Sequence, residues 1–172
     1  RNPRFDLDSV YGDGPLANPE LYEPVSRTSR ERPTKLRIES GGLFEDVPRT
    51  RDGSAIIADP RNDENMVMSG LQAAFMLFHN HAVDLVKHED RGASSEEVYE
   101  KANQLTRWHY QWIVLHEILP LFIGQAAVDH ILNHGCKFYQ PEKPQIPVEF
   151  QGAVYRMGHT LVRPSYRANL AG

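Results

Sequence analysis

The stretch SSEEVYEKANQLTRWHYQWIVLHEILP, residues 94–120, predicts a long amphipathic helix and therefore favours a mainly α fold. Ser94 and Glu97 form a capping box, in which each side chain can accept a hydrogen bond from a backbone N–H group at the start of a helix. Pro120 is the expected end of the helix, because proline has no N–H group to donate. Apolar side chains recur between these points at the spacing of one helix face: Val98, Ala102, Leu105, Trp108, Trp112, Leu115 and Leu119.

A second amphipathic helix is predicted upstream, over residues 63–88. Asp63 and Glu64 fall in its first turn, where negative charge is favourable to the helix dipole. Its apolar residues recur at steps of three and four: Met68, Leu71, Phe75, Phe78, Ala82 and Leu85.

Two further helices are expected downstream. A short one covers residues 124–134, with Gly135 as its C-cap. The last runs from about residue 148 to about residue 161 and ends before Pro164. Residues 1–60 are rich in Pro, Gly, Asp and Arg and are predicted to form loops with brief strands. The chain thus divides into an irregular segment, 1–60, and a helical core, 61–172.

Composition excludes several classes of protein. The net charge of −4 offers no large basic surface, so nucleic acid is not an expected partner. Cys136 is the single cysteine, so neither an internal disulfide nor a CxxC metal site can form. No apolar run of 18 residues is present, and no membrane span is predicted. The chain does not begin with methionine, and we expect a fragment or one chain of a processed protein.

Individual motifs leave alternatives open. The triplet HNH at 79–81 lies in the middle of a predicted helix, so we interpret it as structural rather than as a nuclease motif. Asp6 and Asp8 offer alternating oxygen ligands that suit Ca²⁺, but the same pattern also occurs in plain turns. Arg61 is either an exposed side chain paired with Asp63 or Glu64, or a cation that polarises a ligand. His159 is either a core histidine or a ligand.

Five stretches in this order resemble the animal-type haem peroxidases, the superfamily that also contains cyclooxygenases and fatty-acid dioxygenases. They are FDLDSVYG at 5–12, DPRNDEN at 59–65, FHNHAVDLV at 78–86, LTRWHYQWIVLHEILP at 105–120 and YRMGHTLVRP at 155–164. The resemblance implies the central helices of that fold, with long loops, incomplete in this chain. The single cysteine and short loops suggest a bacterial member.

The resemblance also implies residue roles around haem b. His159 corresponds to the proximal histidine that binds the haem iron, and Arg156 to an arginine that pairs with a haem propionate. Gly158 lets the backbone approach the flat macrocycle. Arg61 corresponds to the distal catalytic arginine, and Glu64 to a glutamate that forms an ester with the haem in some members.

A calcium site and missing segments follow from the same resemblance. Asn2, Asp6, Asp8 and the carbonyl of Arg4 fall on the family's calcium loop. The distal histidine lies upstream of that loop in the family, and the asparagine that orients the proximal imidazole lies beyond residue 172. This chain alone therefore lacks the distal histidine, and its expected partners are the N- and C-terminal parts of the same domain.

The implied activity is a secreted, haem-dependent peroxidase that reduces hydrogen peroxide and oxidises a halide or a small organic donor. A fatty-acid dioxygenase of the same superfamily is the alternative. That branch carries a tyrosine three residues before the proximal histidine, whereas Arg156 occupies this position and Tyr155 lies one place earlier. A helical interaction domain without cofactor is the third hypothesis.

Overall fold

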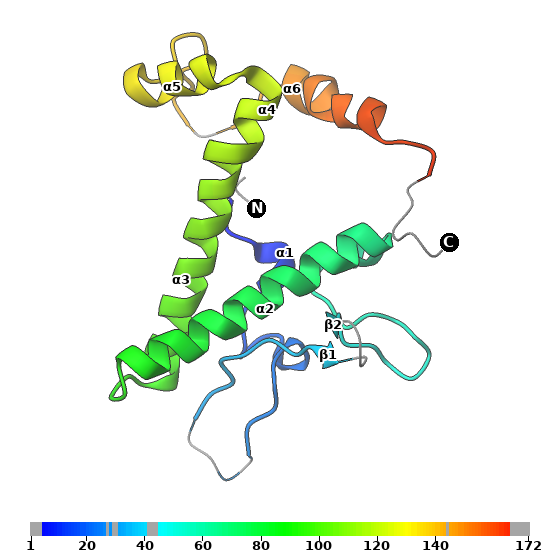
Figure 1. The fold of residues 1–172 in the computed structure, drawn as a ribbon, viewed down its shortest axis with the longest axis vertical. Coiled ribbons are helices and arrows are strands. Elements are labelled where there is room, and N and C mark those ends of the chain that lie inside the picture. Colours follow the sequence, from blue (N-terminus) through cyan, green and yellow to red (C-terminus); the bar gives the residue numbers. More distant parts are fainter. Residues whose placement is uncertain (1–4, 27, 29–30, 41–44, 144, 166–172) are drawn as a thin grey trace. The chain divides into compact units, whose positions relative to one another are not determined.

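The structure is a computed structural model that describes residues 5–26, 28, 31–40, 45–143 and 145–165. Contacts between Cα atoms divide the chain into two compact units. One comprises residues 5–130, and the other comprises residues 131–172 together with the first four. Helices dominate both units, as the sequence predicts (Figure 1).

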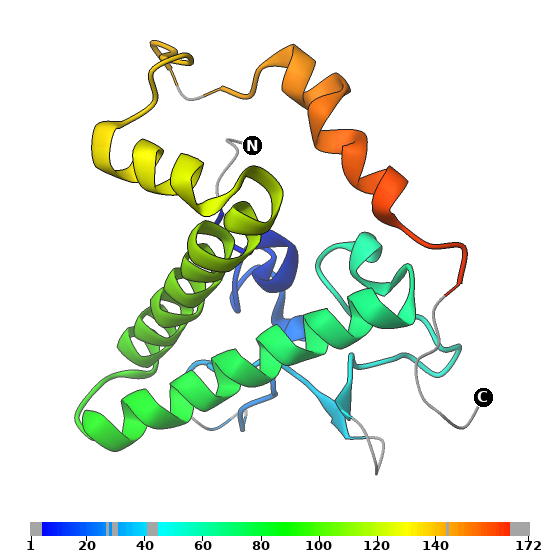
Figure 2. The same cartoon turned by 45° about the horizontal axis from the view of Figure 1, so that its top comes forward.

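Two long helices, α2 (Met66–Glu89) and α3 (Ser95–Ile113), form an antiparallel hairpin at the centre of the first unit. They pack closely near the connecting turn and diverge from it, so that α1 (Asp8–Tyr11) lies between their separated ends (Figures 1 and 2). Small and β-branched side chains fill the packed end and let the helix backbones approach. They are Ala82, Val83, Val86, Val98 and Ala102.

The N-terminal ends of both helices are capped. The predicted capping box of α3 is confirmed: the Glu97 N–H donates to Ser94 Oγ at 3.3 Å, and the Ser94 N–H donates to Glu97 Oε2 at 2.8 Å. Helix α2 begins three residues later than predicted, because Asn65 is its N-cap and accepts from the N–H groups of Val67 and Met68, both at 3.1 Å.

The prediction that Pro120 ends the helix is wrong. Helix α3 continues through a π-helical turn, η3 (Val114–Ile118), into α4 (Leu119–Ile123). Pro120 lies in the first turn of α4, directly after the π-helical turn in which the hydrogen-bonding register of the helix changes. The chain turns instead at Gly124, whose φ of 81° is readily adopted only by glycine.

The buried face of α2 differs from the predicted stripe except at Ala82, which is buried as predicted. Leu71, Phe78 and Leu85 are 50%, 38% and 44% exposed, while the face rotated by about one residue is buried. That face carries polar side chains among its apolar ones: Ser69, Gln72, Ala73, Met76, His79, Ala82, Val83 and Val86. On α3 the prediction holds for Val98 and Ala102 but not for Trp108 and Trp112, which are more than half exposed.

The segment before α2 wraps against the hairpin with little regular structure, as predicted. Its short elements are α1, the 3₁₀ turn η1 (Pro19–Leu21), the antiparallel strands β1 (Glu39–Ser40) and β2 (Glu45–Asp46), and the 3₁₀ turn η2 (Pro60–Asp63). Asn80 of α2 fixes this segment, because its side chain accepts from the N–H of Leu36 and donates to the carbonyl of Leu36, both at 2.8 Å. The core beneath it contains Leu7, Val10, Tyr11, Leu21, Tyr22, Leu36, Val47 and Met76.

The C-terminal helices are short. Helix α5 (Gln125–His134) is confirmed with its predicted C-cap, since the N–H of Gly135 donates to the Ile131 carbonyl at 2.8 Å. The helix expected over 148–161 is present in two pieces, α6 (Val148–Gly152) and the 3₁₀ helix η4 (Val154–Leu161), separated at Ala153. Among the described residues, no helix combines the length and apolar character that a bilayer crossing needs.

Candidate functional site

Arg61 lies on η2, immediately before α2, with its side chain 77% exposed. Its partner is Asp59, not Asp63 or Glu64 as the sequence suggested. The Arg61 Nε donates to Asp59 Oδ1 at 2.9 Å, and Nη2 lies 2.5 Å from Oδ2. Asp59 also accepts from the backbone N–H of Arg61 at 3.0 Å. One carboxylate therefore fixes both the backbone turn and the direction of the guanidinium.

Asp63 serves a different cation. Arg49 Nη1 and Nη2 donate to the two Asp63 carboxylate oxygens, each at 2.8 Å, and Arg49 Nε donates to Asp46 at 3.1 Å. The hydrogen bonds from Arg49 lower the pKa of the Asp63 carboxyl. This bidentate pair joins the loop after β2 to η2, and it leaves Glu64 exposed at the C-terminal end of η2.

Arg156 and His159 lie on η4 in the second unit, both exposed. A 3₁₀ helix has three residues per turn, so side chains three positions apart project from the same face. The structure therefore places the two predicted haem contacts on one face. Gly158 is next to His159, and a Cβ atom added there would meet nothing within 4 Å.

Exposed apolar side chains flank this pair within its own unit. Val162, three positions after His159, is 63% exposed, and Met157 and Leu161, which project from the adjoining faces, are 47% and 61% exposed. An apolar surface with one imidazole and one guanidinium suits a flat apolar macrocycle that carries a metal and acidic substituents. The residues present on η4 therefore fit haem.

Asp6 and Asp8 flank Leu7, which has a φ of 58°. A non-glycine residue in this left-handed region is uncommon, and here Leu7 is the N-cap residue of α1. The N–H of Asp8 donates to Asp6 Oδ1 at 3.4 Å. The two other expected calcium ligands, Asn2 and Arg4, lie outside the described residues. In the part of the chain that is described, no group of three or more His, Cys, Asp or Glu side chains is placed to hold a metal ion.

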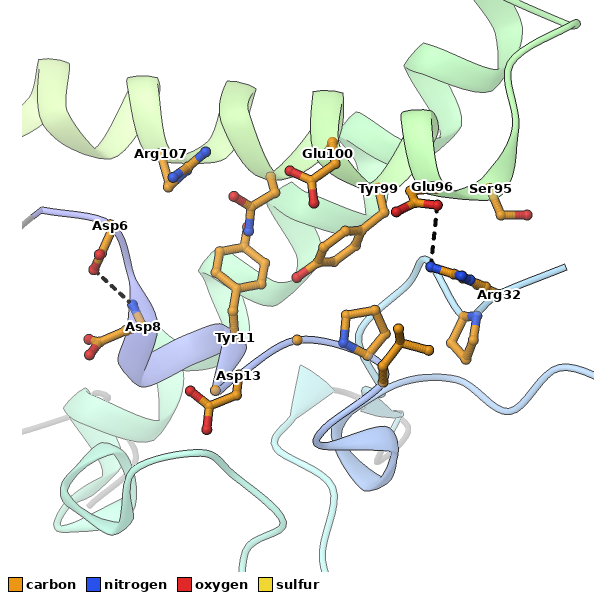
Figure 3. Close-up of a pocket in the computed structure, with 16 residues that line it drawn as sticks. Asp6, Asp8, Tyr11, Asp13, Arg32, Ser95, Glu96, Tyr99, Glu100 and Arg107 are labelled. Carbon is orange, nitrogen blue, oxygen red and sulfur yellow. Dashed lines mark hydrogen bonds and ion pairs between the residues drawn. The ribbon is translucent and has the colours of Figure 1, made fainter.

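The two aspartates line one end of a cavity of about 430 Å³ between α1, α3 and the loop after α1 (Figure 3). Tyr11, Tyr99 and Arg107 form its inner wall. At the other end, Arg32 pairs with Glu96 at 3.3 Å. This cavity was not predicted from the sequence, because its walls come from segments about 90 residues apart.

His79 is fully buried and structural, as interpreted from the sequence. Its Nε2 lies 2.8 Å from the Thr34 carbonyl oxygen, and its Nδ1 lies 3.1 Å from the Tyr11 hydroxyl. Burial lowers the pKa of His79 to about 4, opposed in part by the hydrogen bond to Thr34. The neighbouring Tyr22 hydroxyl contacts that of Tyr99 at 3.1 Å. Sequence reasoning found the histidine but not the tyrosines that surround it.

We expect this histidine to make the protein less stable in mild acid. In the unfolded chain its pKa is near 6.5, so between that value and about 4 only the unfolded state binds the proton. The contribution of His79 to the free energy of unfolding is complete above its pKa in the unfolded chain, and it is lost as the pH falls toward its pKa in the folded protein. From pH 7 to pH 5 the free energy of unfolding should decrease by about 2 kcal/mol. Urea unfolding at the two pH values measures it.

His79→Gln is the matched variant for that measurement. It is less stable at both pH values, because the buried hydrogen bonds are disturbed. It should nevertheless lose most of the pH dependence in this window. An unchanged dependence would show that another group is responsible.

Known proteins and one solved structure resemble this chain. The family model described as animal haem peroxidase matches residues 6–170. "Dual oxidase" from Drosophila melanogaster is 28% identical over 109 residues, which is 63% of this chain and 7% of the relative. "Alpha-dioxygenase 1" from Arabidopsis thaliana is 35% identical over 106 residues, which is 62% of this chain and 15% of the relative. The chain thus spans less than a fifth of each relative's length.

A solved structure, "Peroxidase A from Dictyostelium discoideum (DdPoxA)", superimposes with a TM-score of 0.65 and 16% sequence identity. It covers 90% of this chain, which corresponds to 30% of that chain. The likeness confirms the predicted helical peroxidase fold. The family match over nearly the whole sequence leads to one conclusion: the chain belongs to the animal haem peroxidase family.

Proposed function

We propose that the protein is a haem-dependent peroxidase that reduces hydrogen peroxide and oxidises a halide or a small organic donor. The observation that carries the proposal is the face of η4, where His159 and Arg156 project together from an uncovered apolar surface. Membership of the animal haem peroxidase family implies haem as the cofactor, and this face fits haem. We include in the proposal an extracellular location and the need for N- and C-terminal parts of the same domain.

The chain's own residues take distinct parts in this function. Haem, when bound, supplies the iron at which peroxide is reduced and the donor is oxidised. His159 donates an imidazole lone pair to the iron, and Arg156 pairs with a propionate. Arg61 stabilises the negative charge that develops on the departing peroxide oxygen, a role that suits a guanidinium held in place. Asp59 is the positioning residue that holds it.

Haem titration tests the proposal. We expect the protein, together with the N- and C-terminal parts of its domain, to bind one equivalent of haem with a Soret band and to consume peroxide in the presence of iodide or a phenol. Haem binding without peroxide consumption would contradict the peroxidase function. Absence of haem binding would favour the third hypothesis, a helical interaction domain.

Fatty-acid oxygenation is the second candidate, and the similarity to "Alpha-dioxygenase 1" favours it. Tyr155 lies on η4 but is one position from Arg156, and neighbouring residues on a 3₁₀ helix differ by about 120° in direction. The tyrosine therefore projects from a different face than His159. Oxygen uptake with a fatty acid that disappears in Tyr155→Phe would establish the dioxygenase instead.

For the loop around Leu7, we propose that Asn2, Asp6, Asp8 and the Arg4 carbonyl bind calcium. Asp6→Ala with Asp8→Ala should lower the melting temperature by several degrees in calcium, because two charged ligands of a hard cation are lost. In excess chelator the variant should melt like the unsubstituted protein. Equal shifts under both conditions, measured by calorimetry, would show that the loop is a plain turn.

Glu64 is proposed to form an ester with the haem. Its exposed position at the C-terminal end of η2, three residues after Arg61 in sequence, leaves its carboxylate available. Acid-acetone extraction followed by mass spectrometry distinguishes attached from free haem. Release of all haem from the active enzyme would exclude the ester.

A further inference from the structure

We propose that Tyr11 and His79 form a redox-active pair, in which Tyr11 loses one electron while its phenol proton passes to His79. The two side chains come from α1 and α2 and are 4% and 0% exposed. The Tyr11 hydroxyl oxygen lies 3.1 Å from His79 Nδ1, and the two rings meet edge to face with centroids 5.2 Å apart.

The direction of the hydrogen bond follows from the other imidazole nitrogen. His79 Nε2 lies 2.8 Å from the Thr34 carbonyl oxygen, which can only accept, so Nε2 carries the proton. Burial holds the pKa of His79 near 4, so the ring is neutral at physiological pH and Nδ1 keeps its lone pair. Tyr11 therefore donates to a base.

The chemistry of phenol oxidation requires such a base. Removal of an electron turns the phenol into a strong acid, which gives up its proton to a stronger base within hydrogen-bond distance. Desolvation raises the pKa of Tyr11, so the phenolate is not available as an easier electron donor. With His79 as acceptor, the O–H bond breaks, an N–H bond forms at Nδ1, and the products are a neutral phenoxyl radical and an imidazolium. Return of one electron reverses both transfers.

The other tyrosines of this cluster lack an equivalent acceptor. The Tyr22 hydroxyl donates to the Tyr11 backbone carbonyl at 3.0 Å. In its 3.1 Å contact with Tyr99 it must then accept, with Tyr99 as donor. Carbonyl and phenol oxygens are weak bases compared with imidazole. Among the described tyrosines of the cluster, oxidation is therefore expected to be easiest at Tyr11.

Tyr99 connects the pair to the surface. Its ring lies 6.4 Å from that of Tyr11 and 5.8 Å from that of His79, both edge to face. Tyr99 and Tyr11 also line the 430 Å³ cavity, which opens to solvent (Figure 3). An electron donor in this cavity would touch Tyr99 and could reduce the radical. In the protein, the peroxidase reaction proposed above supplies the oxidant. The biological role of the Tyr11–His79 pair therefore rests on that proposed function, whereas its redox property does not.

Electron paramagnetic resonance of the full protein tests the pair. The protein is oxidised either with a photoexcited ruthenium tris-bipyridine complex and persulfate or, after loading with haem, with hydrogen peroxide, and the samples are freeze-quenched. We expect a tyrosyl radical in the photo-oxidised sample that Tyr11→Phe removes and Tyr139→Phe, a half-exposed control, retains. A full signal in Tyr11→Phe would overturn the proposal.

A second measurement uses the unsubstituted protein, so its result does not depend on whether the variants fold. With ¹⁵N-labelled histidine, we expect the radical to show a hyperfine coupling to one nitrogen, because protonated Nδ1 donates back to the phenoxyl oxygen. A tyrosyl radical without this coupling would contradict the proposal. A radical from the photo-oxidant but none from peroxide would overturn the biological role of the pair and leave its redox property supported, while peroxide consumption in the same samples tests the peroxidase function separately.

Discussion

His159→Ala should lose the Soret band at haem concentrations that saturate the unsubstituted protein. Within η4, His159 is the imidazole on the face that also carries Arg156, and the surrounding side chains are apolar. Without the axial bond, these apolar contacts and a single cation are left to hold the macrocycle. We expect the remaining haem to bind weakly and without a fixed axial ligand, as measured by titration and by the ferric spin-state spectrum.

His134→Ala is the matched control, because His134 is also an exposed histidine of the second unit and ends α5. It should bind haem like the unsubstituted protein. A Soret band that survives His159→Ala at full intensity would show that another residue binds the iron.

Arg61→Ala should bind haem normally but react with hydrogen peroxide about 10²- to 10³-fold more slowly, the range found when a fixed electrostatic stabiliser is removed. The Asp59 carboxylate holds the guanidinium at two points, so little reorganisation is needed during reaction. Arg61→Lys should recover only part of the rate, because an ammonium group cannot reproduce the planar fork. Stopped-flow absorbance at the Soret band measures the rate.

Two variants sharpen the result for Arg61. Asp59→Asn keeps the guanidinium but weakens its anchor, and an intermediate rate with unchanged haem affinity is expected. Arg51→Ala removes an exposed arginine of the same unit and should react at the normal rate. Equal rates for Arg61→Ala and Arg51→Ala would remove Arg61 from the mechanism.

Features with short-range causes could be predicted from the sequence. The capping box at Ser94 and the C-cap at Gly135 depend on residues within one turn, and both are present. The helical setting of the histidine at position 79 was also predicted. The order of the five family-like stretches predicted the fold, which the structural comparison confirms.

Features that depend on distant segments could not be predicted. Periodicity marks which side chains of α2 share a face, but not which face is buried. Hydrogen bonds to the segment before α2 decide that, and they bury His79 and place Asn80 beside Leu36 instead of exposing them. The continuation past Pro120 depends on a π-helical turn, for which periodicity gives no signal.

For the site, the sequence predicted residue types better than partners. Arg156 and His159 share a face because their spacing suits both an α- and a 3₁₀ helix. The prediction that Arg61 pairs with Asp63 or Glu64 was wrong. Both acidic residues follow Arg61 closely in the sequence, but Asp63 is hydrogen-bonded to Arg49. Asp59 could have been found by its N-cap position two residues before Arg61.

The most direct measurement is a crystal structure of the haem-loaded protein. We expect His159 to be the side chain that holds the haem iron, Arg156 to lie at a propionate, and Arg61 to face the position where peroxide binds. Iron held by any other side chain, or Arg61 remote from that position, would contradict this expectation.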